Sequence, residues 1–181
     1  AEPENGINPA SAIKEILELQ EKMVQPNTNQ KDFFLMTPIH ILMGEKAYGV
    51  SAGKGEVHFT IRAWDPLIMK EKLANLLSHV ENIVQKHQLK HEISWTDEFL
   101  ANVNSVSGVN ILQKVCQKRH LPYRELEHPL KWGEDFGYIS QKYEGAFIGI
   151  GAGVNSPALH HPNYDFPDEL IKIGVDLLLG I

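Results

Sequence analysis

The sequence predicts an α+β protein in two parts: two helices on a small antiparallel sheet up to about residue 105, then an α/β segment to residue 181. Three observations support this fold class. In residues 1–105 the apolar side chains follow the order helix, strand, strand, helix, strand. Two pairs, Asn8-Pro9 and Asp65-Pro66, have the cap-plus-proline form of a helix start. Beyond residue 105 the spacing indicates three helices and one apolar strand.

The first part opens with a predicted helix that starts at Asn8-Pro9 and carries an apolar stripe as far as Val24. Residues 33–44 are strand-like. Pro38 lies within them and has no N–H to donate to a ladder, which indicates a sheet edge or a bulge. Residues 55–64 then show a clear alternation of apolar and polar side chains, as expected of a strand with one buried face.

A second long helix is predicted after Asp65-Pro66, and residues 89–96 are predicted as a strand with Ile93 and Trp95 on its buried face. The order of elements matches the split βαβ, or ferredoxin-like, plan of strand, helix, strand, strand, helix, strand, without its opening strand. We therefore expect that first strand to be missing from this chain, and truncation is the simple explanation.

The second part, residues 106–181, has predicted helices at 109–120, 134–143 and 168–179 and a predicted buried strand at 146–150. A parallel sheet covered by helices needs more strands than these residues supply. The sequence therefore predicts that residues 106–181 form one edge of a larger layered domain rather than a domain of their own.

Composition excludes several classes of function. The net charge is −6 and no basic stripe occurs, so the chain lacks the electrostatic pattern of a nucleic-acid-binding protein. No run of apolar residues is long enough to span a bilayer. Cys116 is the only cysteine, which rules out an intrachain disulfide and favours a core residue. A cytoplasmic location is the default expectation, with a removed upstream signal as the open alternative.

Candidate chemistry is concentrated between residues 132 and 165. The glycine cluster 149–153 is followed by a loop rather than a helix, which favours a sharp turn over a dinucleotide site. His160 and His161 lie in the next loop, after the predicted strand, where α/β folds place their sites. Imidazole is the commonest metal ligand in proteins, although an isolated His-His pair is more often two exposed loop residues. The other seven of the nine histidines are interpreted as structural or surface residues.

Several motifs occur in an order that resembles the C-terminal part of the metal-dependent aminoacylase/carboxypeptidase family. These motifs are Phe59-Thr60-Ile61-Arg62, Glu134-Asp135-Phe136, Gly151-Ala152-Gly153 and Leu159-His160-His161-Pro162. The nearest branch contains hippurate hydrolase and the plant auxin-conjugate amidohydrolases. The resemblance implies a zinc-peptidase-like catalytic α/β domain with one or two metal ions, zinc or manganese, and an inserted ferredoxin-like lid domain that pairs two subunits. On this basis residues 1–105 are the dimerisation (lid) domain and residues 106–181 the C-terminal segment of the catalytic domain.

The resemblance also implies roles for individual residues. His160 matches the metal-ligating histidine of the family, whereas His161 falls on a variable position. The family's catalytic glutamate and remaining ligands precede the lid domain, so we expect no catalytic residue in this chain. One imidazole is too few ligands for a catalytic zinc site, and this chain alone is expected to be inactive. The intact enzyme would be a homodimer that hydrolyses the amide bond of N-acyl amino acids or similar small amides, without nucleic-acid or membrane partners.

Four further residues are candidates for the substrate pocket or for contacts with the metal ligand: Glu134, Asp135, His161 and Arg62. For the two carboxylates, capping the helix that starts there is an equally good interpretation. For the arginine, a solvated strand position is the better one. The chain also departs from the family's pattern at 49–52, where an Asn-Val-Ile-Pro segment is common, and at Gly133, where Ser is common. Substrate preference is therefore not transferred, and a non-catalytic dimerisation or ligand-binding module is the alternative function.

Overall fold

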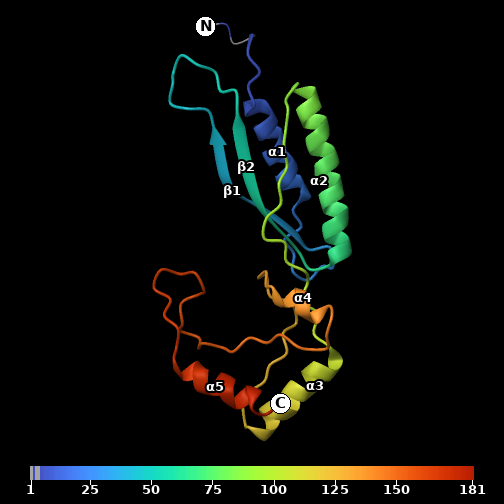
Figure 1. Cartoon of the computed structure of the whole chain (residues 1–181), viewed down its shortest axis with the longest axis vertical. Coiled ribbons are helices and arrows are strands. Elements are labelled where there is room, and N and C mark those ends of the chain that lie inside the picture. The colour runs from blue at the N-terminus through green and yellow to red at the C-terminus, as the bar shows by residue number, and fades with distance from the viewer. Residues whose placement is uncertain (1, 3–4) are drawn as a thin grey trace. The chain divides into compact units, whose positions relative to one another are not determined.

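The computed structural model describes residue 2 and residues 5–181, and the chain divides into two compact units. Unit 1 contains the chain up to Glu98 together with His128–Lys131, and unit 2 contains Phe99–Glu127 and Trp132–Ile181. The described residues form a two-stranded antiparallel sheet and five helices (Figure 1). The α+β class predicted from the sequence is therefore confirmed.

Unit 1 is a β-hairpin covered on one face by two helices (Figure 1). The elements are α1 (Ala10–Met23), β1 (Phe34–Met43), β2 (Gly55–Ala63) and α2 (Pro66–Lys86). Phe34 and Met36 of β1 and Leu76 of α2 are the buried centre, and apolar side chains from α1 and β2 pack against them. Burial of these large side chains in a shared core holds the helices against the hairpin.

The predicted helix starts are present. The Asp65 carboxylate accepts a hydrogen bond from the Leu67 N–H at 2.7 Å, and Pro66 occupies the first turn of α2. The Asn8 side chain accepts in the same way from the Ala10 N–H at 2.9 Å, just before α1. Each cap satisfies a backbone donor that has no partner within its helix.

Pro38 lies beside an irregularity in β1, as its missing N–H predicts. The strands pair in regular antiparallel register from Phe34↔Ala63 to Pro38↔Phe59, and after a shift the pairing resumes at His40↔His58. One extra residue in β1 reverses the alternation of side chains along the strand. As a result Ile41 stays on the helix side, while His40 is turned to the opposite face with His58.

The predicted strand at residues 89–96 is wrong. This segment follows α2, and none of its residues forms a strand. Ile93 and Trp95, which were predicted to be buried, are 42 % and 46 % exposed. An extended segment becomes a strand only when a neighbour supplies ladder hydrogen bonds. The two described strands form a sheet only with each other, and the one further pairing is an isolated bridge between Gln25 and Phe34, so residues 89–96 have no such neighbour among the described residues.

Unit 2 is built from α3 (Val106–Lys118), α4 (Phe136–Ser140) and α5 (Glu169–Leu178). Its core joins Leu112, Val115 and Cys116 of α3 to Leu177 of α5. The burial of Cys116 confirms its interpretation as a core residue. Helix α3 begins three residues earlier than predicted because the Ser105 hydroxyl accepts from the Gly108 N–H at 3.0 Å.

The predicted strand at residues 146–150 is also wrong, since no described residue there belongs to a sheet. The Asn104 side chain bonds to this segment instead. Its amide nitrogen donates to the Phe147 carbonyl at 2.9 Å, and its amide oxygen accepts from the Phe147 N–H at 2.8 Å. One side chain thus satisfies both backbone groups that a neighbouring strand would have bonded. The helix predicted at 134–143 is shorter than expected, because only the five residues of α4 are helical.

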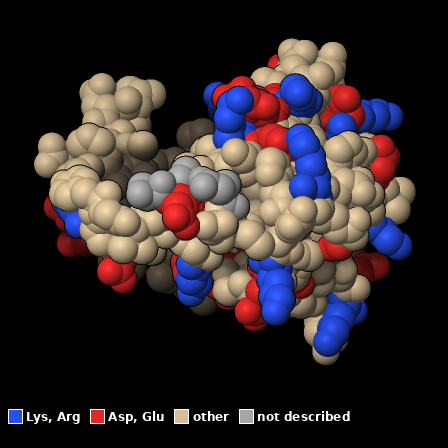
Figure 2. All heavy atoms as spheres, turned by 90° about the horizontal axis from the view of Figure 1, so that it is seen from above, with Lys and Arg blue, Asp and Glu red and all other residues tan. Residues whose placement is uncertain are grey.

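On the face that Figure 2 shows, basic and acidic side chains are interspersed rather than gathered by sign. Among the described helices, none combines the length and hydropathy that a membrane span requires.

Candidate functional site

His160 lies at the surface in a tight loop of unit 2. Its backbone is left-handed, with φ +66°, and its side chain is exposed. Such a conformation costs a non-glycine residue about 1 kcal/mol or more and persists where surrounding bonds impose it. Here the His161 N–H donates to the Ala158 carbonyl at 3.0 Å and the Tyr164 N–H to the His161 carbonyl at 2.8 Å. The His160 ring itself has no hydrogen bond or ion pair within the described chain, so both nitrogens are free to meet a ligand.

His161 differs from its neighbour because its ring is engaged by the loop. The Asn163 N–H donates to Nδ1 of His161 at 3.1 Å. In the neutral ring this bond places the proton on Nε2. His161 is therefore the weaker candidate for a metal ligand.

The glycine cluster before this loop makes a turn, as predicted. Gly153 has φ +102°, a conformation that L side chains rarely adopt, and the Ser156 N–H donates to its carbonyl at 3.2 Å. The chain then passes through a loop to His160 without a helix start that could hold a pyrophosphate.

Glu134 and Asp135 precede α4 and begin it with their backbone carbonyls. The Gly137 N–H donates to the Glu134 carbonyl at 3.4 Å, and the Tyr138 N–H to the Asp135 carbonyl at 3.0 Å. The Asp135 side chain makes no capping hydrogen bond and is exposed, whereas Glu134 is half-buried. Side-chain capping therefore does not account for Asp135.

Arg62 belongs to β2 in unit 1, and its guanidinium is tied to the same unit. Nη1 donates to the Lys131 carbonyl at 2.5 Å. Close by in sequence, the Trp64 ring stacks on Phe33 at 4.3 Å and on His128 at 5.7 Å between centroids. These contacts dock residues 128–131 on the hairpin and give Arg62 a structural partner.

No predicted site residue belongs to a formed metal centre. Across residue 2 and residues 5–181, no three histidine, cysteine or acidic side chains converge to hold an ion. Arg62 lies in unit 1 and the other four candidates in unit 2. The described residues supply one imidazole without a hydrogen-bond partner in the candidate loop, that of His160. A catalytic zinc requires about three protein ligands, so these residues alone do not fit such a site.

The electrostatically perturbed groups lie elsewhere. A hydrogen-bonded lysine lowers the pKa of three carboxyl groups: Glu15, Glu56 and Asp176. One cluster near Glu56 was missed by sequence reasoning, which placed His40 and His58 among the surface histidines. Their rings lie 5.2 Å apart across the two strands. The signal that could have found them is the strand register, and the bulge after Pro38 hides it from simple alternation.

Comparisons with known proteins identify relatives over nearly the whole chain. No family model matches. The N-acetyldiaminopimelate deacetylase of Bacillus licheniformis is 23 % identical over 168 residues, which are 92 % of this chain and 44 % of the relative. That of Bacillus velezensis is 22 % identical over 166 residues, 88 % of this chain and 42 % of the relative. That of Streptococcus pneumoniae is 44 % identical over a 48-residue stretch, 26 % of this chain and 12 % of the relative.

The fold also has a solved counterpart. A dinuclear metal-binding peptidase of the M20 family from Bacillus subtilis superposes with a TM-score of 0.73 at 17 % identity, covering 96 % of this chain and 45 % of that one. The chain thus spans less than half the length of the relatives it matches. The chain is thus similar in sequence to N-acetyldiaminopimelate deacetylases along almost its full length, and it shares the fold of that M20 peptidase.

Proposed function

We propose that this chain is part of a metal-dependent amidohydrolase that cleaves the amide bond of N-acyl amino acids or similar small amides. The observation that carries the proposal is the alignment of 92 % of the chain with an N-acetyldiaminopimelate deacetylase, since deacetylation of an N-acetyl amine is amide hydrolysis. Residues 1–105 would be the dimerisation (lid) domain and residues 106–181 the C-terminal part of the catalytic domain. The change from one compact unit to the other at Glu98/Phe99 supports a boundary in this region.

The metal would be one or two divalent ions, zinc or manganese, which supply Lewis-acid chemistry to the amide. His160 is the ligand that this chain would contribute, and its exposed, unbonded ring supports that role. The remaining ligands and the catalytic glutamate would come from sequence outside this chain, so the 181 residues alone are expected to be inactive. Glu134 and Asp135 are proposed pocket residues; His161 and Arg62 are weaker candidates because their polar atoms already have partners.

The test uses a protein of the relatives' length that contains this sequence. Hydrolysis of N-acetyldiaminopimelate and of an N-aroyl amino acid is measured after treatment with a chelator and after zinc or manganese is restored. We expect the chelator to abolish activity and one of the two metals to recover it. Cleavage that is insensitive to the chelator, or absent with either metal, would overturn the proposal in favour of a non-catalytic dimerisation or ligand-binding module.

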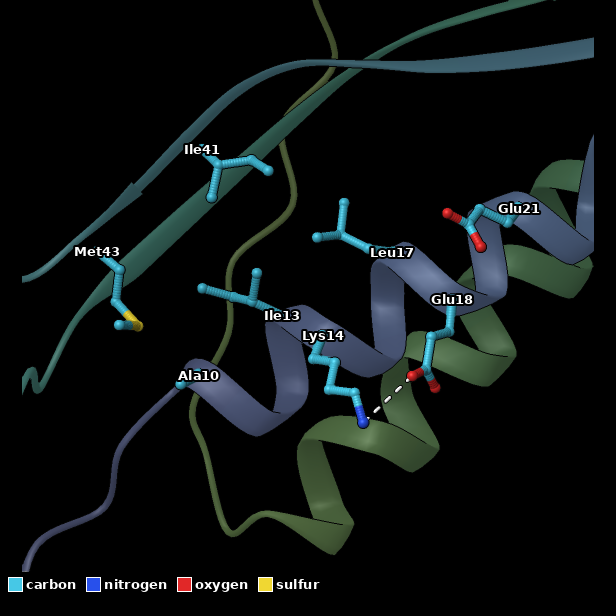
Figure 3. A pocket seen from close by; sticks show the side chains of 8 residues that line it. All are labelled: Ala10, Ile13, Lys14, Leu17, Glu18, Glu21, Ile41 and Met43. Atoms are coloured by element: carbon cyan, nitrogen blue, oxygen red, sulfur yellow. Dashed lines mark ion pairs between the residues drawn. The ribbon is translucent and has the colours of Figure 1, made fainter.

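We further propose that two copies pair through β1. One edge of β1 is bonded to β2. Among the described residues its other edge is bonded only at Phe34, through an isolated bridge to Gln25, so the rest of that edge is a template for another chain. Four apolar side chains near its end are 42–61 % exposed: Ile39, Ile41, Leu42 and Met43. Beside them a groove of about 330 Å³ lies between β1 and α1 (Figure 3), where Ile13 and Leu17 face Ile41 and Met43.

Light scattering of the purified chain tests the pairing. The parent is expected to have the mass of a dimer, and Ile41→Lys the mass of a monomer, because a charged side chain would be buried without a partner in the interface. Val50→Lys is the matched control, since Val50 is 76 % exposed in the loop between the strands and outside the groove. A monomeric parent, or a dimer that survives Ile41→Lys, would remove the proposal.

A cytoplasmic location is also proposed. The one cysteine of the sequence is buried and free, so the chain has no intrachain disulfide, the bond that an oxidising compartment favours. Fractionation of cells that express the natural gene tests this: recovery with the cytoplasmic marker is expected, and recovery in the extracellular or periplasmic fraction would contradict it.

A further inference from the structure

A cluster of metal-binding side chains lies on the face of the hairpin away from its helices. His40 and His58 are direct cross-strand partners, and Glu56 precedes His58 by two residues on the same face of β2. Both imidazoles are exposed, and the Glu56 side chain is 42 % exposed. The apolar core lies on the opposite face, so these three groups play no part in packing.

The separation of the two rings matches joint ligation of one ion. Their centroids are 5.2 Å apart. Two imidazole nitrogens, each about 2.0–2.1 Å from a tetrahedral zinc, place their ring centroids about 5 Å apart. The rings are nearly perpendicular, at 88°, so one ring must turn about its χ2 angle to aim a nitrogen at the ion. Both rings are exposed, so they are not enclosed by core side chains and have room for that rotation.

The Glu56 carboxylate lies close enough to His58 to become the carboxylate partner that a metal-ligating histidine commonly has. Its Oε2 lies 3.6 Å from Nε2 of His58. A histidine ligand commonly directs its second ring N–H to a carboxylate, which fixes the tautomer and raises the basicity of the ligating nitrogen. A hydrogen bond from Nε2 of His58 to Glu56 in the metal-bound form would leave Nδ1 as the nitrogen for the metal.

Among the described residues, Lys54 is the one cation in contact with this cluster, through an ion pair of 3.3 Å with Glu56. That contact and the one with His58 lower the pKa of Glu56, so its carboxylate is ionised at neutral pH. The Glu56 charge therefore offsets the repulsion that Lys54 exerts on an incoming cation. Lys54 is 86 % exposed and can move away from the cluster.

We propose that His40 and His58 form a binding site for a divalent transition-metal ion such as Zn²⁺, Ni²⁺ or Cu²⁺, with Glu56 orienting His58. Water completes the coordination, which is consistent with the lack of any three convergent ligand groups in the described chain. The ion links β1 to β2 immediately after the bulge, where the strand ladder is disrupted. This site is separate from the His160 loop and does not depend on the proposed hydrolase function.

The experiment is a titration of the full chain with Zn²⁺ alone, followed by calorimetry, and a second titration with Ni²⁺, followed by NMR of the histidine ring protons. His40→Ala and His58→Ala are each expected to lower the affinity for the ion by about tenfold or more. Glu56→Gln is expected to lower it by about tenfold, because removing the hydrogen-bond partner of a ligating histidine typically costs about 10–100-fold in metal affinity. Lys54→Gln is expected to bind Zn²⁺ at least as tightly as the parent. All four side chains are exposed, and circular dichroism verifies that each variant is folded.

The matched control is the double variant His160→Ala/His161→Ala, which removes the other candidate histidines and keeps the strand pair. The proposal predicts that this variant retains the site and that the His40 and His58 ring protons broaden first with Ni²⁺. It is overturned if the loop variant abolishes binding, if His40→Ala binds like the parent, or if Ni²⁺ broadens the histidine signals uniformly.

Discussion

Gly137 offers a sharp test of the packing in unit 2. A Cβ added at this buried glycine would lie 2.0 Å from the Leu100 carbonyl oxygen and 2.7 Å from its carbon. Both atoms are backbone, so the clash cannot be relieved by a side-chain rotamer. Restoring even a tight contact of 3.0 Å requires the chain at Leu100 to retreat by about 1 Å.

The expected cost of Gly137→Ala follows from two opposing effects. Overpacking costs about 1–3 kcal/mol, and a required backbone shift favours the upper end of that range. Alanine regains up to about 1 kcal/mol through its better helix propensity in α4. We therefore expect unit 2 to lose about 2 kcal/mol of stability, which is about thirtyfold in its opening equilibrium.

Native-state hydrogen exchange measures this loss within one unit. Amides in the core of α3 should exchange about thirtyfold faster in Gly137→Ala. Amides of β1 in unit 1 serve as the internal reference. Gly151→Ala is the matched control, because an added Cβ there meets nothing within 4 Å, and it should leave the α3 rates unchanged. Unchanged α3 protection in Gly137→Ala would refute the packing described here.

Three further predictions concern unit 1. Phe34→Ala, at a fully buried position, should lower the free energy of unfolding by about 3–5 kcal/mol in urea titrations, and a loss below about 1 kcal/mol would contradict the core assignment. Asp65→Ala removes the cap of α2 and should cost about 1 kcal/mol in the same assay, whereas Asp65→Asn should retain most of it. Glu15 accepts hydrogen bonds from Lys86 and His87, both at 2.8 Å, and these contacts lower its pKa below the usual 4.5. The lowered pKa of Glu15 stabilises the folded chain at pH values above the pKa of the unfolded state, and this stabilisation is lost as the pH falls through the pKa of the folded state. The difference in unfolding free energy between the parent and Glu15→Gln should therefore shrink below about pH 4.5. A difference that is independent of pH would show that the carboxylate charge is not responsible.

Much of unit 1 is predictable because its signals are local. The Asp65-Pro66 pair encodes both the cap and the first turn of α2, and the structure contains both. The alternation along residues 55–64 places Phe59 and Ile61 on the core side, where they pack. Pro38 predicts an irregularity in β1, and the register shift occurs beside it.

The predictions that were wrong concern segments whose structure depends on residues far away in the sequence. Residues 89–96 have the composition of a strand, yet strand formation requires a neighbour that the described chain does not supply. At residues 146–150, the Asn104 side chain takes over the bonding of Phe147, and no periodicity in the sequence reveals such a substitution. The same limit applies to the candidate sites. A loop histidine such as His160 is visible in the sequence, but the meeting of His40 and His58 depends on cross-strand register.

We propose that His160 supplies a ligand to the metal of an amidohydrolase. This role of His160 is tested most directly in a protein of the relatives' length that contains this sequence. Its metal content is measured by elemental analysis after gel filtration, and all variants also carry His40→Ala so that the proposed site at His40 and His58 does not bind metal. We expect His161→Ala to retain the metal of the parent and His160→Ala to lose it, with affinity reduced by about a hundredfold or more. Full metal content in His160→Ala, or equal loss in both variants, would contradict this role of His160.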